Sequence, residues 1–322
     1  MKASVRYSYG PVESIQIQEL PIPEPRPDEL RIRVHATTVN RTDIGVLTGK
    51  PYLMRAFAGF PKPNKPVTGT DFAGVVDQVG SEVTAFQPGD RVWGFDDNGA
   101  GSHAEYLCLS SQKAILPIPK GADFTDIVAC AEAAHYAINF INKVSLQAED
   151  HVLVNGGTGA IGSAAIQLLK ARGIEVTAVC PEIHAEKVKA LGADRVIPLE
   201  KMDFTQEPVQ YDFVFDAVGK SRFSLCKAIL RPGGTYISTE LGPNWENIGL
   251  ALTTPIWGKK KVIFPLPVDI PQSLKVCAEL YGQGKFKPLI DRSYPLDQVR
   301  EAFAYVASGK KIGNVLLDLS KK

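Results

Sequence analysis

A glycine-rich segment in the middle of the chain limits the possible folds more than any other part of the sequence. An apolar run at 151–155 leads into Gly157-x-Gly159-x-x-Gly162, and apolar residues at helical spacing continue to Lys170. A strand, a glycine turn and a helix in direct succession are typical of the first β-α unit of a parallel sheet. Glycine lets the backbone bend tightly at Gly157, approach a pyrophosphate at Gly159 and pack a helix against a strand at Gly162. We interpret the segment as a dinucleotide-binding turn whose helix N-terminus holds the phosphates, with a purely structural β-α turn as the alternative.

The apolar pattern changes along the chain at about residue 123. Before it, short alternating runs predict an antiparallel, β-rich unit, with strands at 15–20, 30–34, 72–79, 90–94, 104–109 and 113–118. After it, helical segments alternate with short apolar strands, which predicts a doubly wound parallel sheet, with strands at 151–155, 175–179, 195–197, 213–215, 235–238 and 261–264. The tail predicts a helix at 272–281, then a strand, a helix at 296–307 and a last strand at 314–319. The expected fold class is therefore α/β, a β-rich domain combined with a doubly wound sheet.

Length, charge and cysteine usage exclude several classes of protein. With 322 residues the chain is long enough for two domains. Its 36 Lys and Arg balance 35 Asp and Glu, so we do not expect nucleic acid as a partner. No apolar stretch approaches a membrane span, so we expect no membrane partner and a cytoplasmic location. The five cysteines are scattered without a Cys-x-x-Cys pair, which argues against a structural zinc site.

A series of short motifs resembles one known superfamily along nearly the whole chain. The motifs occur in the same order as in that superfamily, at 28–43, 69–76, 88–92, 104–106, the glycine turn, 191–194, 215–219 and 231–234. The chain resembles the medium-chain dehydrogenase/reductase superfamily, and more narrowly its zinc-lacking, quinone oxidoreductase-like branch. The resemblance implies a GroES-like catalytic domain formed by 1–121 and 287–322, a Rossmann domain at 122–286, an active site in the cleft and a homodimer.

The motifs also lack the metal ligands of zinc-bearing relatives. Those relatives place a Cys in the segment occupied here by Asn40, and a Gly-His-Glu where this sequence has Gly69, Thr70 and Asp71. The resemblance therefore implies a reaction without zinc. Because zinc lowers the pKa of an alcohol hydroxyl, its absence favours an acceptor that is already electrophilic, namely a quinone or an α,β-unsaturated carbonyl.

The resemblance also implies a set of site residues. Asn40 and Asp43 match the Asn-x-x-Asp pattern of the branch, and Tyr136 lies where a hydroxyl would approach the nicotinamide. Asn and Asp are also common cap residues and Tyr is a common core residue, so both interpretations stay open. Gly45 stands where many relatives carry a Tyr, which leaves no obvious proton donor. The expected cofactor contacts are Gly157, Thr158, Gly159, Ala160, Ile161, Gly162, Cys180, His184, Ala217, Val218, Leu241 and Asn314.

The choice between NADPH and NADH depends on the end of the second Rossmann strand. NAD-specific domains carry an acidic residue about 20 positions beyond the glycines, but Val179 and Cys180 stand there. An uncharged strand end favours NADPH, and His184 would contribute more as the pH falls. Glu182 could instead bond a ribose hydroxyl, which keeps NADH as an alternative, or it could be a solvated carboxylate at a helix start.

Two other functions remain open at this point. One is a zinc-free reductase of alcohols or isolated carbonyls, which would use the same cofactor. The other is a sensor or scaffold that binds NADPH without catalysis, because a fold alone does not establish an activity. Reduction of conjugated acceptors in preference to simple ketones would distinguish the enzyme that we expect from both.

Overall fold

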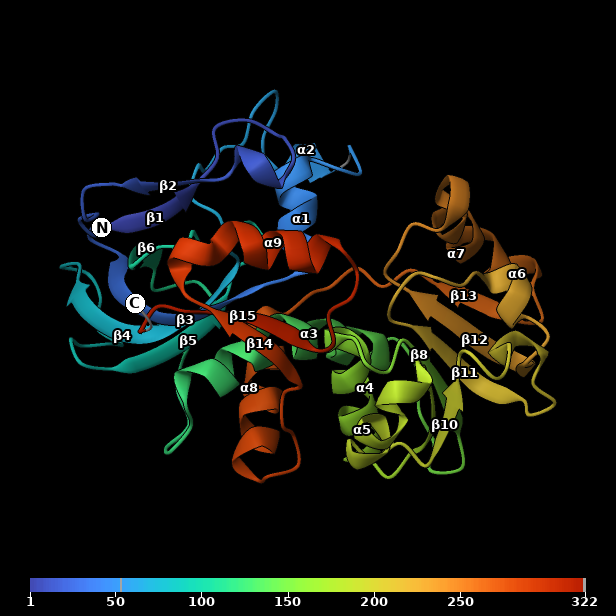
Figure 1. Ribbon diagram of the computed structural model, residues 1–322. Helices are drawn as coiled ribbons and strands as arrows, with labels where there is room; N and C mark the ends of the chain where they lie inside the picture. The colour runs from blue at the N-terminus through green and yellow to red at the C-terminus, as the bar shows by residue number, and fades with distance from the viewer. Residues whose placement is uncertain (53, 321–322) are drawn as a thin grey trace. The chain divides into compact units, whose positions relative to one another are not determined.

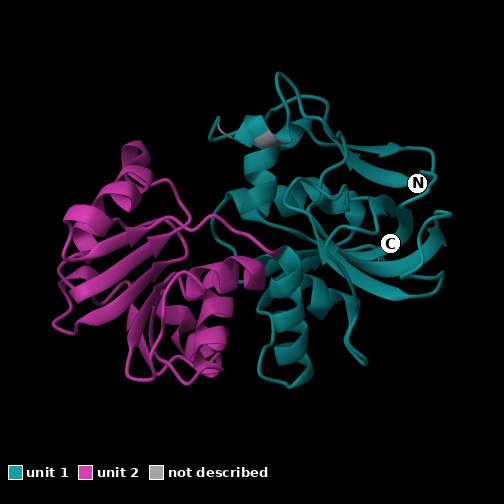
Figure 2. Cartoon of the chain, turned by 180° about the vertical axis from the view of Figure 1, so that it is seen from behind, with its two compact units in different colours: residues 1–132, 270–322 teal, residues 133–269 magenta. Residues whose placement is uncertain are grey.

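The computed structural model describes residues 1–52 and 54–320. The chain forms two compact units, of which unit 1 comprises Met1–Glu132 and Ile270–Lys322 and unit 2 comprises Ala133–Asp269 (Figure 2). Each unit is built around its own sheet. The domain bounds expected from the resemblance, with 122–286 as the internal domain, stay a prediction. Of the helices formed by the described residues, none combines the length and apolar character needed to cross a membrane.

Unit 1 contains a two-stranded sheet and a seven-stranded sheet. The small sheet pairs β1 (Lys2–Val5) with β2 (Gln16–Glu19) in antiparallel fashion. The large sheet has the order β14-β15-β3-β4-β5-β7, with β6 paired to β3, and is antiparallel except between β14 and β15. Its strands are β3 (Glu29–Val39), β4 (Asp71–Val79), β5 (Arg91–Phe95), β6 (Tyr106–Ser110), β7 (Ile115–Pro117), β14 (Ile290–Tyr294) and β15 (Asn314–Asp318). The predicted β-rich unit is confirmed.

Alternation along β3 creates the main core of unit 1. Leu30, Ile32 and Val34 are buried on one face and pack against Phe72 and Val92 of the neighbouring strands. The helices that complete the unit are α1 (Arg41–Thr48), α2 (Met54–Ala58), the first part of α3 (Phe124–Ile141), α8 (Ile270–Gly282) and α9 (Val299–Ala307), with 3-10 turns η1 (Val12–Ser14) and η5 (Leu296–Gln298). The sequence analysis did not predict α1, which carries the predicted site residue Asp43 and has another, Asn40, as its N-cap.

Unit 2 is a doubly wound sheet of six parallel strands in the order β10-β9-β8-β11-β12-β13 (Figure 1). The strands are β8 (His151–Asn155), β9 (Glu175–Cys180), β10 (Arg195–Pro198), β11 (Tyr211–Asp216), β12 (Leu230–Ser238) and β13 (Lys261–Ile263). The connections contain α4 (Ala160–Lys170), α5 (Ala185–Ala190), α6 (Phe223–Cys226), α7 (Glu246–Trp257) and the 3-10 turns η2 (Glu182–His184), η3 (Phe204–Gln206) and η4 (Pro243–Trp245). The strand order reverses between β8 and β11, which confirms the predicted topology and places the binding edge at the carboxyl ends of these strands.

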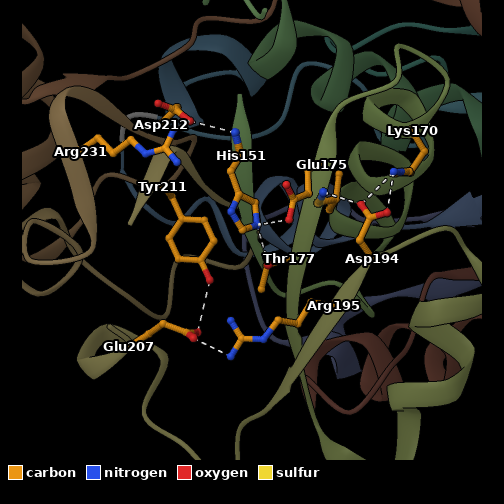
Figure 3. A network of polar contacts seen from close by, with 11 residues as sticks. His151, Lys170, Glu175, Thr177, Asp194, Arg195, Glu207, Tyr211, Asp212 and Arg231 are labelled. Atoms are coloured by element: carbon orange, nitrogen blue, oxygen red, sulfur yellow. Dashed lines mark hydrogen bonds and ion pairs between the residues drawn. The ribbon is translucent and has the colours of Figure 1, made fainter. Parts of the chain in front are cut away.

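The opposite, amino-terminal edge of this sheet is closed by paired charges (Figure 3). His151 at the start of β8 bonds through Nε2 to Thr177 Oγ1 (2.8 Å), and its backbone N donates to an Asp212 carboxylate oxygen (2.9 Å). The ion pairs at this edge are Lys170–Asp194 (2.8 Å), Arg195–Glu207 (2.5 Å) and Arg231–Asp212 (2.7 Å). Because these groups satisfy one another, the edge supports the sheet and the candidate site lies elsewhere.

Candidate functional site

The glycine turn after β8 bends at its first glycine. Gly156 has a φ of 87°, a conformation that side chains rarely adopt, and both Gly156 N and Gly157 N donate to Val179 O (3.1 and 2.9 Å). The tight bend predicted for Gly157 was therefore misplaced by one residue. Gly157 is instead confined by packing, because a Cβ there would lie 3.1 Å from the Cβ of Ala178.

The other two glycines of the motif have different physical reasons. A Cβ on Gly162 would lie 2.2 Å from Gly156 O, so α4 can approach the turn this closely only without a side chain. Gly159 has an ordinary extended conformation (φ −70°), and a Cβ there would meet only Gly156 O, at 3.3 Å. The protein itself thus leaves space in front of Gly159, which is the N-cap of α4 and offers no side-chain cap. The N–H groups of the first turn, which begins at Ala160, point into that space without intrahelical acceptors, so the turn fits a phosphate group.

A buried carboxylate holds the neighbouring loop beside this turn. Asp216, at the end of β11, is fully buried and accepts hydrogen bonds from Asn155 Nδ2 (3.0 Å), Gly219 N (3.0 Å) and the Tyr236 hydroxyl (2.8 Å). These bonds fix the loop that carries the predicted cofactor contacts Ala217 and Val218. A Cβ on Gly156 would lie 2.8 Å from Val218, so this loop does adjoin the turn.

The end of β9 carries no charge of its own, but charges follow it closely. Cys180 is fully buried, and burial raises the pKa of its thiol to about 11. Glu182, at the start of η2, forms an ion pair with Lys201, and its backbone N donates to a Glu200 carboxylate oxygen (2.8 Å). His184 is half-buried at the end of the same turn. The carboxylate that could repel a ribose phosphate is therefore already paired with a cation.

Two further predicted cofactor contacts belong to other segments of the chain than the glycine turn. Leu241 follows β12 in unit 2, is half-buried, and accepts Asn247 N through its carbonyl oxygen (3.1 Å). Asn314 begins β15 in unit 1, is buried, and donates its side-chain amide to Leu289 O (3.1 Å). Their contact with a cofactor stays a prediction.

Unit 1 contains a buried polar cluster around Asn40. Asn40 is the N-cap of α1, and its backbone N donates to an Asp43 carboxylate oxygen (2.8 Å), so the cap interpretation is correct for both residues. The side-chain NH2 group of Asn40 donates to Glu132 Oε2 (2.9 Å) and to Thr38 Oγ1. Thr42 Oγ1 donates to the other oxygen of Glu132 (2.6 Å). Capping thus orients Asn40, and Asn40 in turn orients a buried carboxyl group.

Burial shifts the pKa values in this cluster toward neutrality. Desolvation raises the pKa of Glu132 to about 7, with repulsion from Asp71 adding to the shift. Desolvation also raises the pKa of Asp71 to about 6 and that of Asp43 well above its usual value. The half-buried Lys311 has a pKa lowered to about 8 by desolvation and is attracted to Glu132. A carboxyl group with a pKa near 7 can both hold and release a proton at physiological pH.

The remaining polar groups of unit 1 do not fit a metal ion. His103 uses Nδ1 with Thr68 Oγ1 and Nε2 with Thr38 O, both at 2.8 Å, and burial lowers its pKa to about 4. Asp71 accepts from the backbone N of Thr38 (2.7 Å) and from the hydroxyls of Thr37 and Thr38. Within 1–52 and 54–320, no three His, Cys, Asp or Glu residues are grouped as metal ligands would be.

Tyr136 is the predicted catalytic residue that falls in unit 2. It lies on α3, half-buried, and its ring stands 5.6 Å from that of His135 between centroids. Its role toward a nicotinamide stays a prediction.

Sequence reasoning missed Glu132 and Lys311 as members of the site. Glu132 did carry a signal, since it is the only charged residue within the apolar stretch 127–141 of a long helix, where an ionisable residue is rarely buried without a partner. Lys311 had no comparable signal, because it lies in a short polar connection between α9 and β15.

Comparisons with known proteins agree with this architecture. Residues 26–120 match the family described as an alcohol dehydrogenase GroES-like domain, and residues 191–317 match one described as a zinc-binding dehydrogenase. The chain is 31% identical to a mitochondrial NAD(P)H oxidoreductase of Mus musculus, covering 99% of this chain and 89% of that one. It is 30% identical to the 2-methylene-furan-3-one reductase of Solanum lycopersicum, covering 98% and 79%. The quinone oxidoreductase of Escherichia coli complexed with NADPH superposes with a TM-score of 0.85 at 20% identity, covering 99% and 100%.

Proposed function

We propose that this chain, which belongs to the quinone oxidoreductase-like branch of the medium-chain dehydrogenase/reductase superfamily, reduces quinones or α,β-unsaturated carbonyls with NAD(P)H. The observation that carries this proposal is the glycine turn of unit 2, where the helix N-terminus is uncapped and a Cβ-sized space faces it. Those features match a bound pyrophosphate.

The residues of unit 1 supply a proton to the reduced acceptor in this proposal. When bound, the reduced nicotinamide supplies the hydride, so one proton is still needed to complete reduction of a conjugated double bond. We assign that proton to the Glu132 carboxyl, which holds it up to a pH of about 7. Asn40 and Thr42 hold the two carboxyl oxygens in place, and Asp43 fixes Asn40 through its backbone N. Asn40 and Asp43 then act as positioning residues.

We also propose that no zinc takes part. The proposal is supported by the internal hydrogen bonds of His103 and Asp71, which occupy the donor atoms that a metal would require. An acceptor that is already conjugated needs no Lewis acid, because its own π system spreads the incoming charge.

An acceptor panel tests this function directly. With NADPH, we expect turnover of benzoquinones and of short enones, and rates on isolated ketones lower by about two orders of magnitude, since only conjugated acceptors delocalise the charge. A chelator should leave these rates unchanged. Equal activity on simple ketones would instead show a carbonyl reductase, and cofactor binding without oxidation by any acceptor would show a sensor.

The preferred cofactor in this proposal is NADPH. The strand end at Cys180 is uncharged, and Glu182 is paired with Lys201, so neither excludes a 2′-phosphate. We expect a lower KM for NADPH than for NADH. Glu182→Ala should lower the KM for NADPH a further two- to fivefold or so, because it frees the Lys201 ammonium, and exposed ion pairs are worth only about 0.2–1 kcal/mol.

A matched substitution separates this effect from a general change in charge. Glu186→Ala removes another exposed carboxylate, which pairs with Lys189 on α5, and it should leave both KM values unchanged. A clear NADH preference in the wild type that Glu182→Ala abolishes would show that Glu182 selects NADH, contrary to the proposal.

The homodimer and the cytoplasmic location expected above also remain proposals. A homodimer is supported by β13, which ends the six-stranded sheet, and by the exposed apolar side chains of α7 beside it, Leu252, Ile256 and Trp257. The relative from Mus musculus is named as mitochondrial and one from Spinacia oleracea as chloroplastic, so these names do not support the cytoplasmic location.

A further inference from the structure

A small pocket in unit 1 is lined by residues that the proposed function has not used. Its volume is ≈160 Å³, and its walls come from β1's end, the start of α1, the segment 64–70 and the turn at 98–99. Asn64, Lys65 and Asn98 are exposed at this pocket, whereas Arg6 and Thr68 are buried. Its occupant would therefore be small and would meet a buried cation.

Arg6 is the group in this pocket that the fold leaves unexplained. The residue is only 3% exposed, and its Nε and Nη1 are buried with no hydrogen-bond partner among the described residues. Its backbone is fixed, because Arg6 N donates to Pro66 O (2.8 Å) and Val5 bridges to Val67. Burying guanidinium N–H groups without acceptors is strongly unfavourable, so an acceptor from outside the fold is expected here.

The surrounding charges do not satisfy Arg6. Asp43 also lines the pocket, but its Oδ2 already accepts Asn40 N (2.8 Å), and burial raises its pKa well above the usual value. Within the described part of the chain, no carboxylate lies within 4.0 Å of the Arg6 guanidinium. Lys65 adds a second cation, which donates to Gly99 O (2.5 Å). The pocket is thus lined by two cations and one carboxyl group, that of Asp43, which attracts Arg6 electrostatically without a hydrogen bond to it.

We propose that this pocket holds a carboxylate of the acceptor, so that the preferred substrates are short conjugated carbonyl compounds bearing a carboxylate. The planar guanidinium of Arg6 matches a carboxylate in geometry as well as in charge. The pocket shares Asp43 and Thr70 with the Asn40 cluster, and Thr70 Oγ1 donates to Glu132 Oε2 (3.4 Å), which places the anion beside the proposed proton donor. This inference rests on the proposed function. The volume of the pocket restricts the acid to a few carbon atoms.

Binding without turnover tests the pocket separately from the reaction. The probes are 4-oxopentanoate and its neutral, isosteric amide, titrated into the full chain by calorimetry. We expect the acid to bind at least about tenfold more tightly than the amide, since a charge-assisted hydrogen bond to Arg6 is lost with the amide. Arg6→Met should abolish this difference. Arg55→Met is the matched control, because Arg6 and Arg55 both lie over the Tyr9 ring (5.8 and 4.6 Å to its centroid) but Arg55 does not line the pocket, and this variant should keep the difference.

Kinetics and stability then separate the possible outcomes. In wild type, kcat/KM for 4-oxo-2-pentenoate should exceed that for its amide at least about tenfold, and Arg6→Met should bring the ratio near one. The melting temperature of Arg6→Met without ligand should equal or exceed that of wild type, because an unpaired buried charge is removed. A fall in melting temperature with an unchanged acid-to-amide ratio would show a structural arginine and overturn the inference. Acid binding through Arg6 without reduction of any enone would retain the pocket and overturn the proposed function instead.

Discussion

Gly159→Val is expected to abolish cofactor binding while the protein remains folded. The valine side chain would fill the space in front of the α4 N-terminus, where the structure itself offers only one close contact, Gly156 O at 3.3 Å. A phosphate kept out of this space loses at least two charge-assisted hydrogen bonds of about 1.5–3 kcal/mol each, so affinity should fall about 100-fold or more. Fluorescence titration with NADPH measures the affinity, and thermal unfolding measures the fold.

Two other glycines provide the controls for this experiment. Gly249→Val places the same side chain on the exposed face of α7, where a Cβ meets nothing within 4 Å, and should change neither affinity nor folding. Gly162→Val should destabilise unit 2 itself, because its Cβ would lie 2.2 Å from Gly156 O. Normal NADPH binding by Gly159→Val would show that the phosphates do not sit on this turn.

The parts of the fold that sequence predicted well are those where local and tertiary preferences coincide. The strand at 151–155 was predicted at its true bounds, because a short apolar run is followed directly by glycines and an amphipathic helix. The residue at which the turn bends was harder to predict. The positive φ lies at Gly156, which precedes the glycine motif, and this conformation depends on Val179 O accepting hydrogen bonds from two backbone N–H groups.

The elements that sequence missed depend on contacts made by the folded chain. The helix α1 contains Gly45 and several β-branched residues and spans only eight positions, so its intrinsic propensity is poor. It forms because Asn40 and Asp43 cap it and because Leu47 is buried against Phe303 and its neighbours. In α7, Leu252 and Ile256 are more than 70% exposed, so the helix lacks the one-sided apolar pattern by which helices are recognised.

The site was predicted unevenly for the same reason. Asn40 could be selected from a strand-end motif, but its partner Glu132 lies 92 residues away in the chain. The property that makes Glu132 useful, a pKa near 7, arises from burial and from repulsion by Asp71, neither of which a linear pattern contains. The unpartnered guanidinium of Arg6 likewise exists only after the segment 64–70 has folded over β1.

Glu132→Gln is expected to slow enone reduction by about 10²–10⁴-fold, the usual contribution of a general acid. The wild-type rate should be constant in acid and fall tenfold per pH unit above about 7, because the carboxyl group is active only while protonated and its pKa is raised to about 7. The glutamine variant keeps the hydrogen-bonding shape but has no ionisable proton, so its residual rate should lose this dependence. Steady-state measurements of kcat/KM at pH values on both sides of 7 test both effects.

The same pKa shift makes a second, independent observation possible. The unfolded carboxyl ionises near 4.5 and the folded one near 7, so the folded state binds more protons between these values and wild-type stability falls as the pH rises through that window. Glu132→Gln should flatten this part of the stability curve. Glu29→Gln is the matched control, because it makes the same change at a similarly buried position of unit 1 (8% against 6% exposed), where the carboxylate pairs with Arg26. This variant should keep both the wild-type rate and its fall above a pH of about 7. If Glu132→Gln flattens the stability curve but retains the alkaline fall in rate, then Glu132 is buried and titrates as described, and the proton comes from another group.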